Sequence, residues 1–135
     1  MANVPSLVWA KKVTELLEAN AQFRTDGRAL SGQLFVYDDR GGLTFRFDRG
    51  AVVEIRDSED PLGSRFRLGG PRTAWDKAVR EAVNLDVAGG MGLALEGDLL
   101  SAAGNAMAFL WIWQAMQQAA KGGRKVRRST TGRRK

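Results

Sequence analysis

The feature that most constrains the fold is a change in the spacing of apolar residues, from a helical period to strict alternation. Between residues 43 and 68, apolar side chains alternate with polar or charged ones. The apolar members are Leu43, Phe45, Phe47, Val53, Ile55, Phe66 and Leu68. Alternation of this kind is typical of strands that bury one face and expose the other. Such a sheet needs a layer of helices over its apolar face.

The connections between these strands predict how the strands are arranged. Residues 38–42, 48–50 and 57–63 are short and rich in Asp and Gly, which favours antiparallel neighbours in a meander. Residues 32–37 are apolar on both faces and predict a more enclosed strand. The polar members Arg46, Glu54, Arg56 and Arg67 are interpreted as a solvated network of cross-strand charges.

Helices are predicted both before and after these strands along the sequence. An amphipathic pattern predicts a helix over 5–24, and residues 71–84 read as a second helix, each beginning at a proline. After residue 84 we expect a loop or a turn of helix, then a return strand over 92–96 and a long helix over 98–120. Asp98 is expected to be the N-cap of this last helix. We therefore expect one α+β domain over residues 1–120. Its antiparallel sheet has about five strands, with the N-terminal and C-terminal helices covering one face.

The positive charge is concentrated at the C-terminus. The chain has 135 residues with 21 basic and 15 acidic side chains, a net charge of +6. Eight of the basic residues lie in 121–135 with no acidic one, so residues 1–120 carry 13 basic against 15 acidic side chains. A segment so dense in like charge predicts a disordered basic tail over 121–135. Its candidate contacts with anionic membranes or other polyanions are Arg124, Lys125, Arg127, Arg128, Arg133, Arg134 and Lys135.

Composition limits the chemistry of any site. The chain has no Cys and no His, which excludes thiolate nucleophiles, thiolate-based zinc and the usual general base of hydrolases. Asp86 or Asp98 with Tyr37 is an alternative acid–base pair, but no spacing singles these residues out, and Asp98 is better explained as a cap. Residues 89–92 are not a phosphate loop, because no Gly-Lys-Ser/Thr follows. We expect no catalytic residue, no metal and no cofactor.

The last predicted helix carries the functional signal. Leu99, Ala103, Ala106 and Leu110 form one stripe, which any helix packed on a core would show. A second stripe consists of Phe109, Ile112, Trp113 and Met116. A chain of this size cannot easily bury a helix on all sides, so part of this surface is expected to face an apolar ligand, a partner subunit or a membrane interface.

The order of elements resembles the sterol carrier protein 2-like (SCP-2) lipid-transfer domain. Residues 91–98 (Met-Gly-Leu-Ala-Leu-Glu-Gly-Asp) are similar to that family's return strand, which ends in Gly-Asp or Gly-Asn before the last helix. Residues 66–68 followed by 73–75 resemble its preceding strand-to-helix step. The return strand departs from the family at Met91, where the family often has Gly.

The resemblance implies an apolar tunnel between the sheet and the C-terminal helices that holds a sterol, a fatty acid or another acyl-chain lipid, without chemistry. Access would be controlled by the last helix or by residues 89–92. By position, the ligand-binding residues are Phe45, Phe47, Trp75, Leu93, Leu95, Met107, Leu110, Trp111 and Trp113.

The alternative is a protein-interaction or homodimerisation module that uses the exposed apolar face of the last helix. The direction of the second stripe separates the two, inward over a cavity for the carrier and outward for the interaction module. A basic tail after a lipid-binding domain also suggests peripheral docking on anionic membranes. Specific nucleic-acid recognition is not expected, because the tail has no aromatic residue for stacking. With no recognisable secretory signal and no apolar run long enough to span a bilayer, we expect a cytoplasmic protein.

Overall fold

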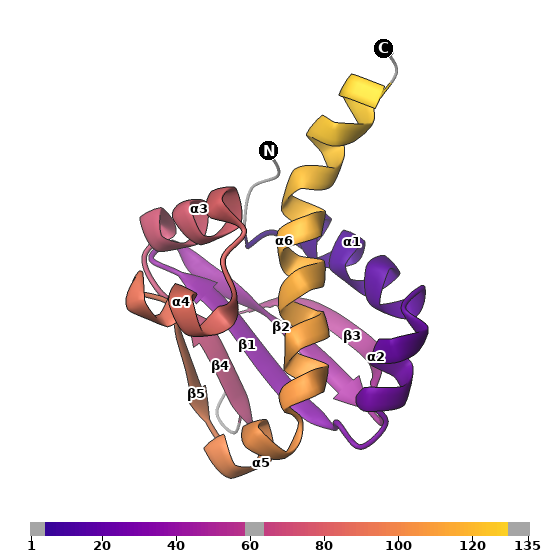
Figure 1. Ribbon diagram of the computed structural model, residues 1–135. Helices are drawn as coiled ribbons and strands as arrows, with labels where there is room; N and C mark the ends of the chain where they lie inside the picture. The colour runs from indigo at the N-terminus through magenta and orange to yellow at the C-terminus, as the bar shows by residue number, and fades with distance from the viewer. Residues whose placement is uncertain (1–4, 59–63, 130–135) are drawn as a thin grey trace.

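The protein is built from one five-stranded sheet with its helices on one face (Figure 1). The computed structural model describes residues 5–58 and 64–129. The strands are β1 (Gly32–Asp38), β2 (Gly41–Asp48), β3 (Ala51–Ser58), β4 (Phe66–Gly69) and β5 (Ala94–Gly97). The helices are α1 (Leu7–Glu18), α2 (Ala21–Asp26), α3 (Arg72–Glu81), α4 (Leu85–Gly90), α5 (Leu99–Gly104) and α6 (Ala106–Ser129). The predicted α+β class is confirmed.

The sheet is mixed, with the strand order β3-β2-β1-β4-β5. β1 pairs antiparallel with β2 and parallel with β4, while the β2–β3 and β4–β5 pairs are antiparallel. The predicted meander is therefore wrong at β4, which lies next to the enclosed strand β1 rather than next to β3. This position lets Phe66 and Leu68 extend the inner apolar face, since they align with Leu34 and Val36 of β1.

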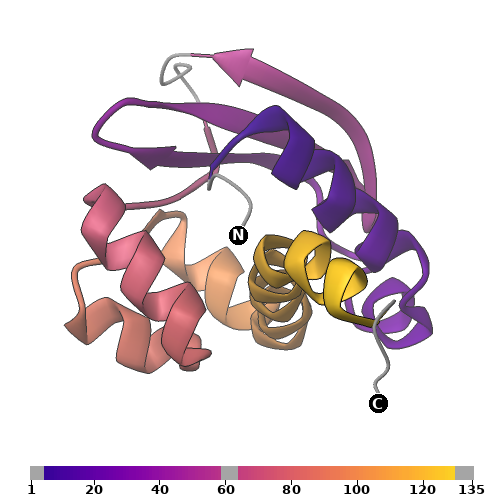
Figure 2. The same ribbon diagram turned by 90° about the horizontal axis from the view of Figure 1, so that it is seen from above.

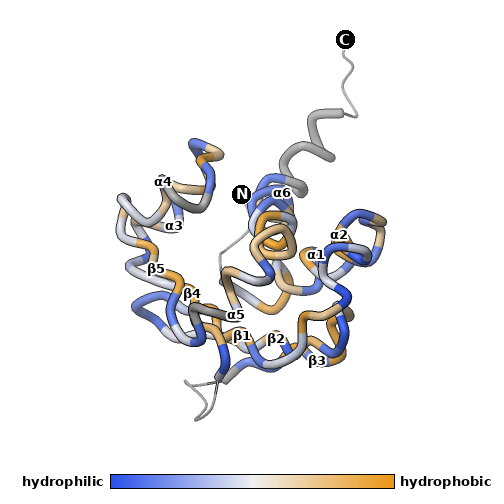
Figure 3. The backbone as a smooth tube through the Cα atoms, turned by 60° about the horizontal axis from the view of Figure 1, so that its bottom comes forward, coloured by the Kyte–Doolittle hydropathy of each residue, from blue (hydrophilic) through white to orange (hydrophobic). Residues whose placement is uncertain are grey.

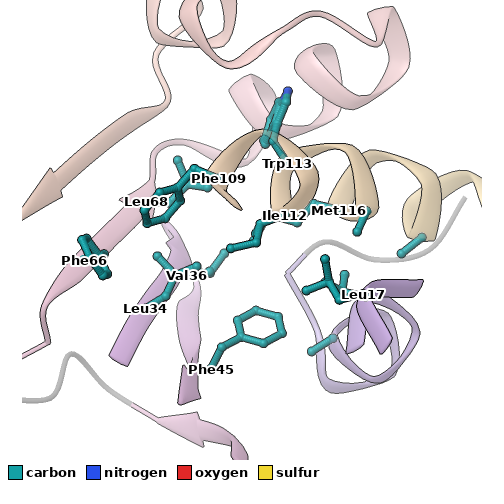
Figure 4. Packing of buried hydrophobic residues seen from close by; sticks show 14 of the residues in the cluster. Leu17, Leu34, Val36, Phe45, Phe66, Leu68, Phe109, Ile112, Trp113 and Met116 are labelled. Carbon is teal, nitrogen blue, oxygen red and sulfur yellow. The ribbon is translucent and has the colours of Figure 1, made fainter. Parts of the chain in front are cut away.

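The inner face of the sheet is the floor of the hydrophobic core. Apolar side chains of β1, β2 and β4 point toward the helices and are at most 3% exposed. They are Leu34, Val36, Leu43, Phe45, Phe47, Phe66 and Leu68. α6 and α1 pack against this face and against each other, as Figures 2 and 4 show. Figure 3 shows the apolar stretches of α6 above the sheet.

The predicted N-terminal helix over 5–24 is two helices. Ser6 caps α1 by accepting the main-chain N–H of Trp9 at 3.2 Å. The Asn20 side chain accepts the N–H groups of Gln22 at 2.9 Å and Phe23 at 3.1 Å, and so begins α2. Asn is a strong N-cap residue, which explains why the chain turns there although its apolar spacing continues.

The predicted helix over 98–120 is also divided. Asp98 caps α5 as expected, since its carboxylate accepts the Ser101 N–H at 3.1 Å. The helix breaks at Asn105, and α6 then runs from Ala106 to Ser129. The disorder expected of the basic tail over 121–135 stays a prediction. Lys, Arg, Gln and Ala are good helix formers, and extending an existing helix needs no new nucleus. Residues 130–135 lie outside the described residues.

Candidate functional site

The candidate site is an open apolar groove where α5, α6 and β5 meet the segment between α3 and α4. Its volume is about 460 Å³, larger than that of either of the two other hollows described below. Its lining residues are Asn84, Leu95, Ala102, Ala103, Ala106, Phe109 and Leu110. Three of the seven are alanines, whose small side chains leave the space that a larger residue would fill.

The break between α5 and α6 shapes this groove. Asn105 ends α5, where its main-chain N–H bonds to Ser101 O at 3.0 Å and its side-chain amide donates to the same carbonyl at 2.9 Å. The change of direction brings Ala102 and Ala103 of α5 beside Ala106 of α6. The alanines therefore form a continuous wall although they belong to two helices.

Phe109 forms the inner wall and connects the groove to the core. It is 6% exposed, and its ring meets Phe66 of β4 edge to face with the centroids 5.0 Å apart. The guanidinium carbon of Arg65 lies over the Phe66 ring, 5.5 Å from its centroid. The inner wall is thus fixed by packing on the sheet, in the region shown in Figure 4.

The opposite wall is held in place by hydrogen bonds from α6. Trp113 Nε1 and Gln117 Nε2 both donate to the main-chain carbonyl of Val83, at 2.8 Å and 2.6 Å. Val83 precedes the lining residue Asn84. Two donors on α6 therefore set the distance between α6 and the segment that faces it across the groove.

The lining of the groove is almost entirely apolar. Asn84 carries the one polar side chain among its described lining residues, and none of them is charged. Among the described residues, no group of three His, Cys, Asp or Glu side chains is placed to hold a metal ion. The chemistry available there is burial of apolar surface, which contributes about 2.5 kcal/mol for each 100 Å².

Tyr37 and Asp98, two of the residues weighed for proton transfer, do not line the groove. Burial, and then the negative charge of Glu96, raise the pKa of Tyr37 on the outer face of the sheet. Hydrogen bonds from Ser101 and then Arg65 lower the pKa of Asp98, which acts as the α5 cap. Tyr37 and Asp98 thus have different partners and different environments.

Two smaller hollows have charged rims. One, of about 240 Å³, lies between α1, α2 and the β2–β3 turn and includes Glu18, Arg24 and Arg49. The other, of about 210 Å³, lies beside the β1–β2 turn and includes the Asp38–Arg40 ion pair, 2.6 Å apart. Both have charged residues in their lining, which the groove beside α6 does not.

The nine predicted ligand-binding residues fall into three groups in the structure. Leu95 and Leu110 line the groove. Met107 is half exposed, and Trp111 donates its indole N–H to Asp26 Oδ2 at 2.8 Å. The other five are at most 3% exposed and belong to the core: Phe45, Phe47, Trp75, Leu93 and Trp113.

The space predicted as a tunnel is filled by aromatic side chains. Trp9 lies edge to face with Phe45 at a centroid distance of 6.2 Å and with Trp75 at 6.1 Å. Trp75 in turn lies 6.1 Å from Trp113. The apolar groove lies at the edge of this core, beside α5 and α6.

The two apolar stripes of the last helix lie differently from what the sequence suggested. Phe109, Ile112, Trp113 and Met116 point inward and are at most 6% exposed. Ala103 and Ala106, which looked like ordinary core positions, line the groove beside Leu110, which was a predicted ligand-binding residue. The bulkier stripe takes the core because its burial removes more apolar area from water. The stripe therefore points inward into a packed core, neither over a cavity nor outward toward a partner.

The sequence reasoning missed Asn84, Ala102 and Phe109 as groove residues and did not single out Ala103. The sequence signal for the helix break that shapes the groove is Gly104 followed by Asn105, since a glycine followed by Asn often ends a helix. A Cβ added at Gly104 would meet nothing within 4 Å, so this glycine marks the break rather than a close approach.

Comparison with solved structures identifies the fold. A crystal structure of sterol carrier protein 2 matches with a TM-score of 0.67 and 17% identity, covering 82% of this chain and 94% of that one. A solution structure from Thermus thermophilus, of a conserved hypothetical protein described as possibly a sterol carrier protein, has a TM-score of 0.66 and 17% identity. It covers 85% of this chain and 88% of that one. A UbiJ-SCP2 ubiquinone synthesis protein has a TM-score of 0.51 and 14% identity, covering 87% and 96%.

These matches define an SCP-2-like fold, as the resemblance in the sequence implied. No protein-family model matches the chain, and no curated protein sequence matches it significantly. Within the described residues, no helix is long and apolar enough to cross a bilayer.

Proposed function

We propose that the protein binds a hydrophobic small molecule, such as a sterol, a fatty acid or another acyl-chain lipid, in the groove beside α5 and α6, and that it carries this ligand without chemical change. The observation that carries the proposal is the apolar lining, with Ala102, Ala103, Ala106 and Leu110 from α5 and α6 and Leu95 from β5, and with no charged side chain among the described lining residues. The fold it shares with a protein named sterol carrier protein 2 supports the same conclusion.

The groove lining also limits the ligand. A charged head group finds no partner among the described lining residues, so we expect the apolar part of the ligand to lie inside and any charged group to remain in water. Asn84 can hydrogen-bond a hydroxyl or carbonyl at the rim.

The test is native mass spectrometry of the purified protein, followed by organic extraction and lipid analysis. We expect a co-purifying hydrophobic molecule in stoichiometric amount, or saturable binding of an added fluorescent fatty acid or sterol. Ala106→Trp and Leu110→Trp, which fill the groove, should raise the dissociation constant of the added probe at least about ten-fold, since loss of about 1.4 kcal/mol of binding already gives that factor.

Gln114→Trp is the matched control. Gln114 is exposed, belongs to the same helix and does not line the groove. This variant should bind like the unmodified protein. A ligand-free protein that also fails to bind either probe, or equal loss in Gln114→Trp and Ala106→Trp, would contradict the proposal.

We further propose that the basic C-terminal segment brings the protein to anionic membranes for ligand exchange. Residues 1–120 are slightly acidic, so the attraction must come from Arg124, Lys125, Arg127, Arg128, Arg133, Arg134 and Lys135. Each basic residue near an anionic surface contributes roughly 1 kcal/mol. Replacing Arg124, Arg127 and Arg128 by Gln should strongly reduce co-sedimentation with vesicles rich in phosphatidylserine. Binding that is equal on neutral phosphatidylcholine vesicles would contradict this role.

A further inference from the structure

The outer margin of the sheet has a long strand with a free edge. In the part of the chain that the structure describes, β3 pairs with β2 on one side and with no strand on the other. It is eight residues long, and Figure 2 shows it along the outer margin of the sheet, away from α6. The unpaired main-chain N–H and C=O groups of such an edge can pair with a further strand.

The side chains of β3 are suited to one particular neighbour. Glu54 and Arg56 lie on the outer face, where their side chains are 43% and 52% exposed. Within the chain, Glu54 forms ion pairs with Arg46 at 3.2 Å and with Arg56 at 4.0 Å. Ile55, between them, lies on the inner face opposite Phe45 and is only partly buried against the core. Val53, at a bulge in the β2–β3 pairing, is 48% exposed. The edge therefore combines incompletely covered apolar side chains with one acidic and one basic residue.

We propose that two copies of this chain dimerise by pairing their β3 strands antiparallel, with Ile55 on the two-fold axis. In an antiparallel pair, opposite residues lie on the same face of the sheet. With Ile55 opposite Ile55 of the second copy, Glu54 faces Arg56 of that copy and Arg56 faces its Glu54. Two opposite-charge pairs then flank a central apolar pair.

The neighbouring registers do not offer this pairing. A two-fold axis through Glu54 places two glutamates opposite each other, and an axis through Arg56 places two arginines opposite each other. Like charges directly opposite are destabilising. Charged residues on an edge usually prevent strand addition, but here they favour one symmetric register and disfavour the next ones.

The dimer would have one continuous sheet across the two copies, with both helical layers on the same face. Because the bulge at Val53 confines regular pairing to the centre of the strand, the interface is small. Small interfaces give weak association, so the dimer should appear as a concentration-dependent equilibrium.

Single cysteine variants test the register directly, since the chain has no cysteine of its own. In the proposed dimer, the two copies of residue 55 are opposite each other with Cα atoms about 4.5 to 5.5 Å apart, within the range of a disulfide. The two copies of residue 53 are offset by four residues, or about 13 Å. Ile55→Cys should therefore form a disulfide-linked dimer at least about ten-fold faster than Val53→Cys.

Val53 is the more exposed of the two residues, so random collision predicts the opposite order. Non-reducing electrophoresis after mild oxidation measures both rates. Faster linkage through residue 55 supports the register. Equal rates, faster linkage through residue 53, or no linked dimer overturns it.

Charge exchange tests the same dimer without touching an apolar residue. Glu54→Arg and Arg56→Glu each replace two opposite-charge pairs by two like-charge pairs, so each should weaken self-association about ten-fold in sedimentation velocity. An equimolar mixture of the two variants should associate again, because each places opposite charges against the other.

Glu81→Arg and Arg80→Glu are controls with the same changes in net charge at exposed positions of α3, and they should leave association unchanged. An unmodified protein that stays monomeric up to about 1 mM, or a mixture that fails to recover, overturns the proposal.

Discussion

Trp9 of α1 donates its indole N–H to the main-chain carbonyl of Met116 in α6, at 2.9 Å. Both residues are essentially buried. The bond joins the first helix of the protein to its last one across the core. α1 and α6 therefore form one helical layer over the sheet, and several properties of the protein depend on this layer.

We expect Trp9→Phe to lower the free energy of unfolding by about 2 kcal/mol. The variant loses a buried hydrogen bond and part of the packing on Phe45 and Trp75. Urea denaturation followed by circular dichroism measures the change. Trp111→Phe is the matched control, because its partner Asp26 is only partly buried and the loss should be smaller. An equal or larger loss in Trp111→Phe would contradict the importance of the Trp9 bond.

Two glycines should respond oppositely to alanine. A Cβ at Gly69 of β4 would lie 2.5 Å from both the carbonyl oxygen and the Cδ1 atom of Tyr37, so Gly69→Ala should destabilise the protein by about 2 kcal/mol or more. A Cβ at Gly104 meets nothing within 4 Å, and Ala favours the helix by up to about 1 kcal/mol. Thermal unfolding of both variants checks the order. A stabilising Gly69→Ala would mean that β4 is not held against Tyr37.

The ionisation of Tyr37 should lie above its ordinary pKa of 10.0, because burial and the charge of Glu96 favour the neutral phenol. Tyr37 is the single tyrosine, so phenolate absorbance near 295 nm reports this group alone. Glu96→Gln should lower the pKa toward 10.0 without reaching it, since burial is the larger cause. No change in that variant would rule out the Glu96 contribution.

This raised pKa also has a consequence for stability. A group whose pKa is higher in the folded protein stabilises the fold below its unfolded pKa and loses that contribution as the pH rises through the folded value. Stability should therefore fall as the pH rises above about 10. Tyr37→Phe should weaken this dependence.

The cap of α5 should become weaker in acid. Hydrogen bonds from Ser101 and Arg65 lower the pKa of Asp98 below 3.8, so its contribution is present above that pH and is lost as the pH falls through the folded value. The stability difference between the unmodified protein and Asp98→Ala should therefore shrink below about pH 3.8, as urea titrations across this range can measure. A difference that is constant with pH would show that the charge of Asp98 does not contribute.

Much of the fold could be predicted from the sequence because its signals are local. Alternation indicated which faces of β2, β3 and β4 are apolar, and Asp98 indicated where α5 begins. The partner of β4 could not be predicted in this way. Turn residues over 57–63 suit a hairpin and a crossing alike, and the choice depends on burying Phe66 and Leu68 beneath distant helices.

The groove was harder to predict than the fold. Ala103 and Ala106 look the same in sequence whether they pack in a core or line an open hollow. Their role depends on the turn at Asn105 and on where Val83 and Asn84 lie, which are relations between distant parts of the chain. The ligand-binding prediction included several large aromatic residues, although most of them fill the core.

The hydrogen bond between Trp9 and Met116 can form only after most of the chain has been synthesised. The two residues are 107 positions apart. At roughly 5 to 20 residues per second, the ribosome needs about 5 to 20 s to make the chain between them. Throughout that interval α1 lacks its main-chain acceptor and the inner face of the sheet lacks α6. A nascent chain halted before Met116 should therefore expose Phe45 and its neighbours and be a better substrate for chaperones than the completed protein.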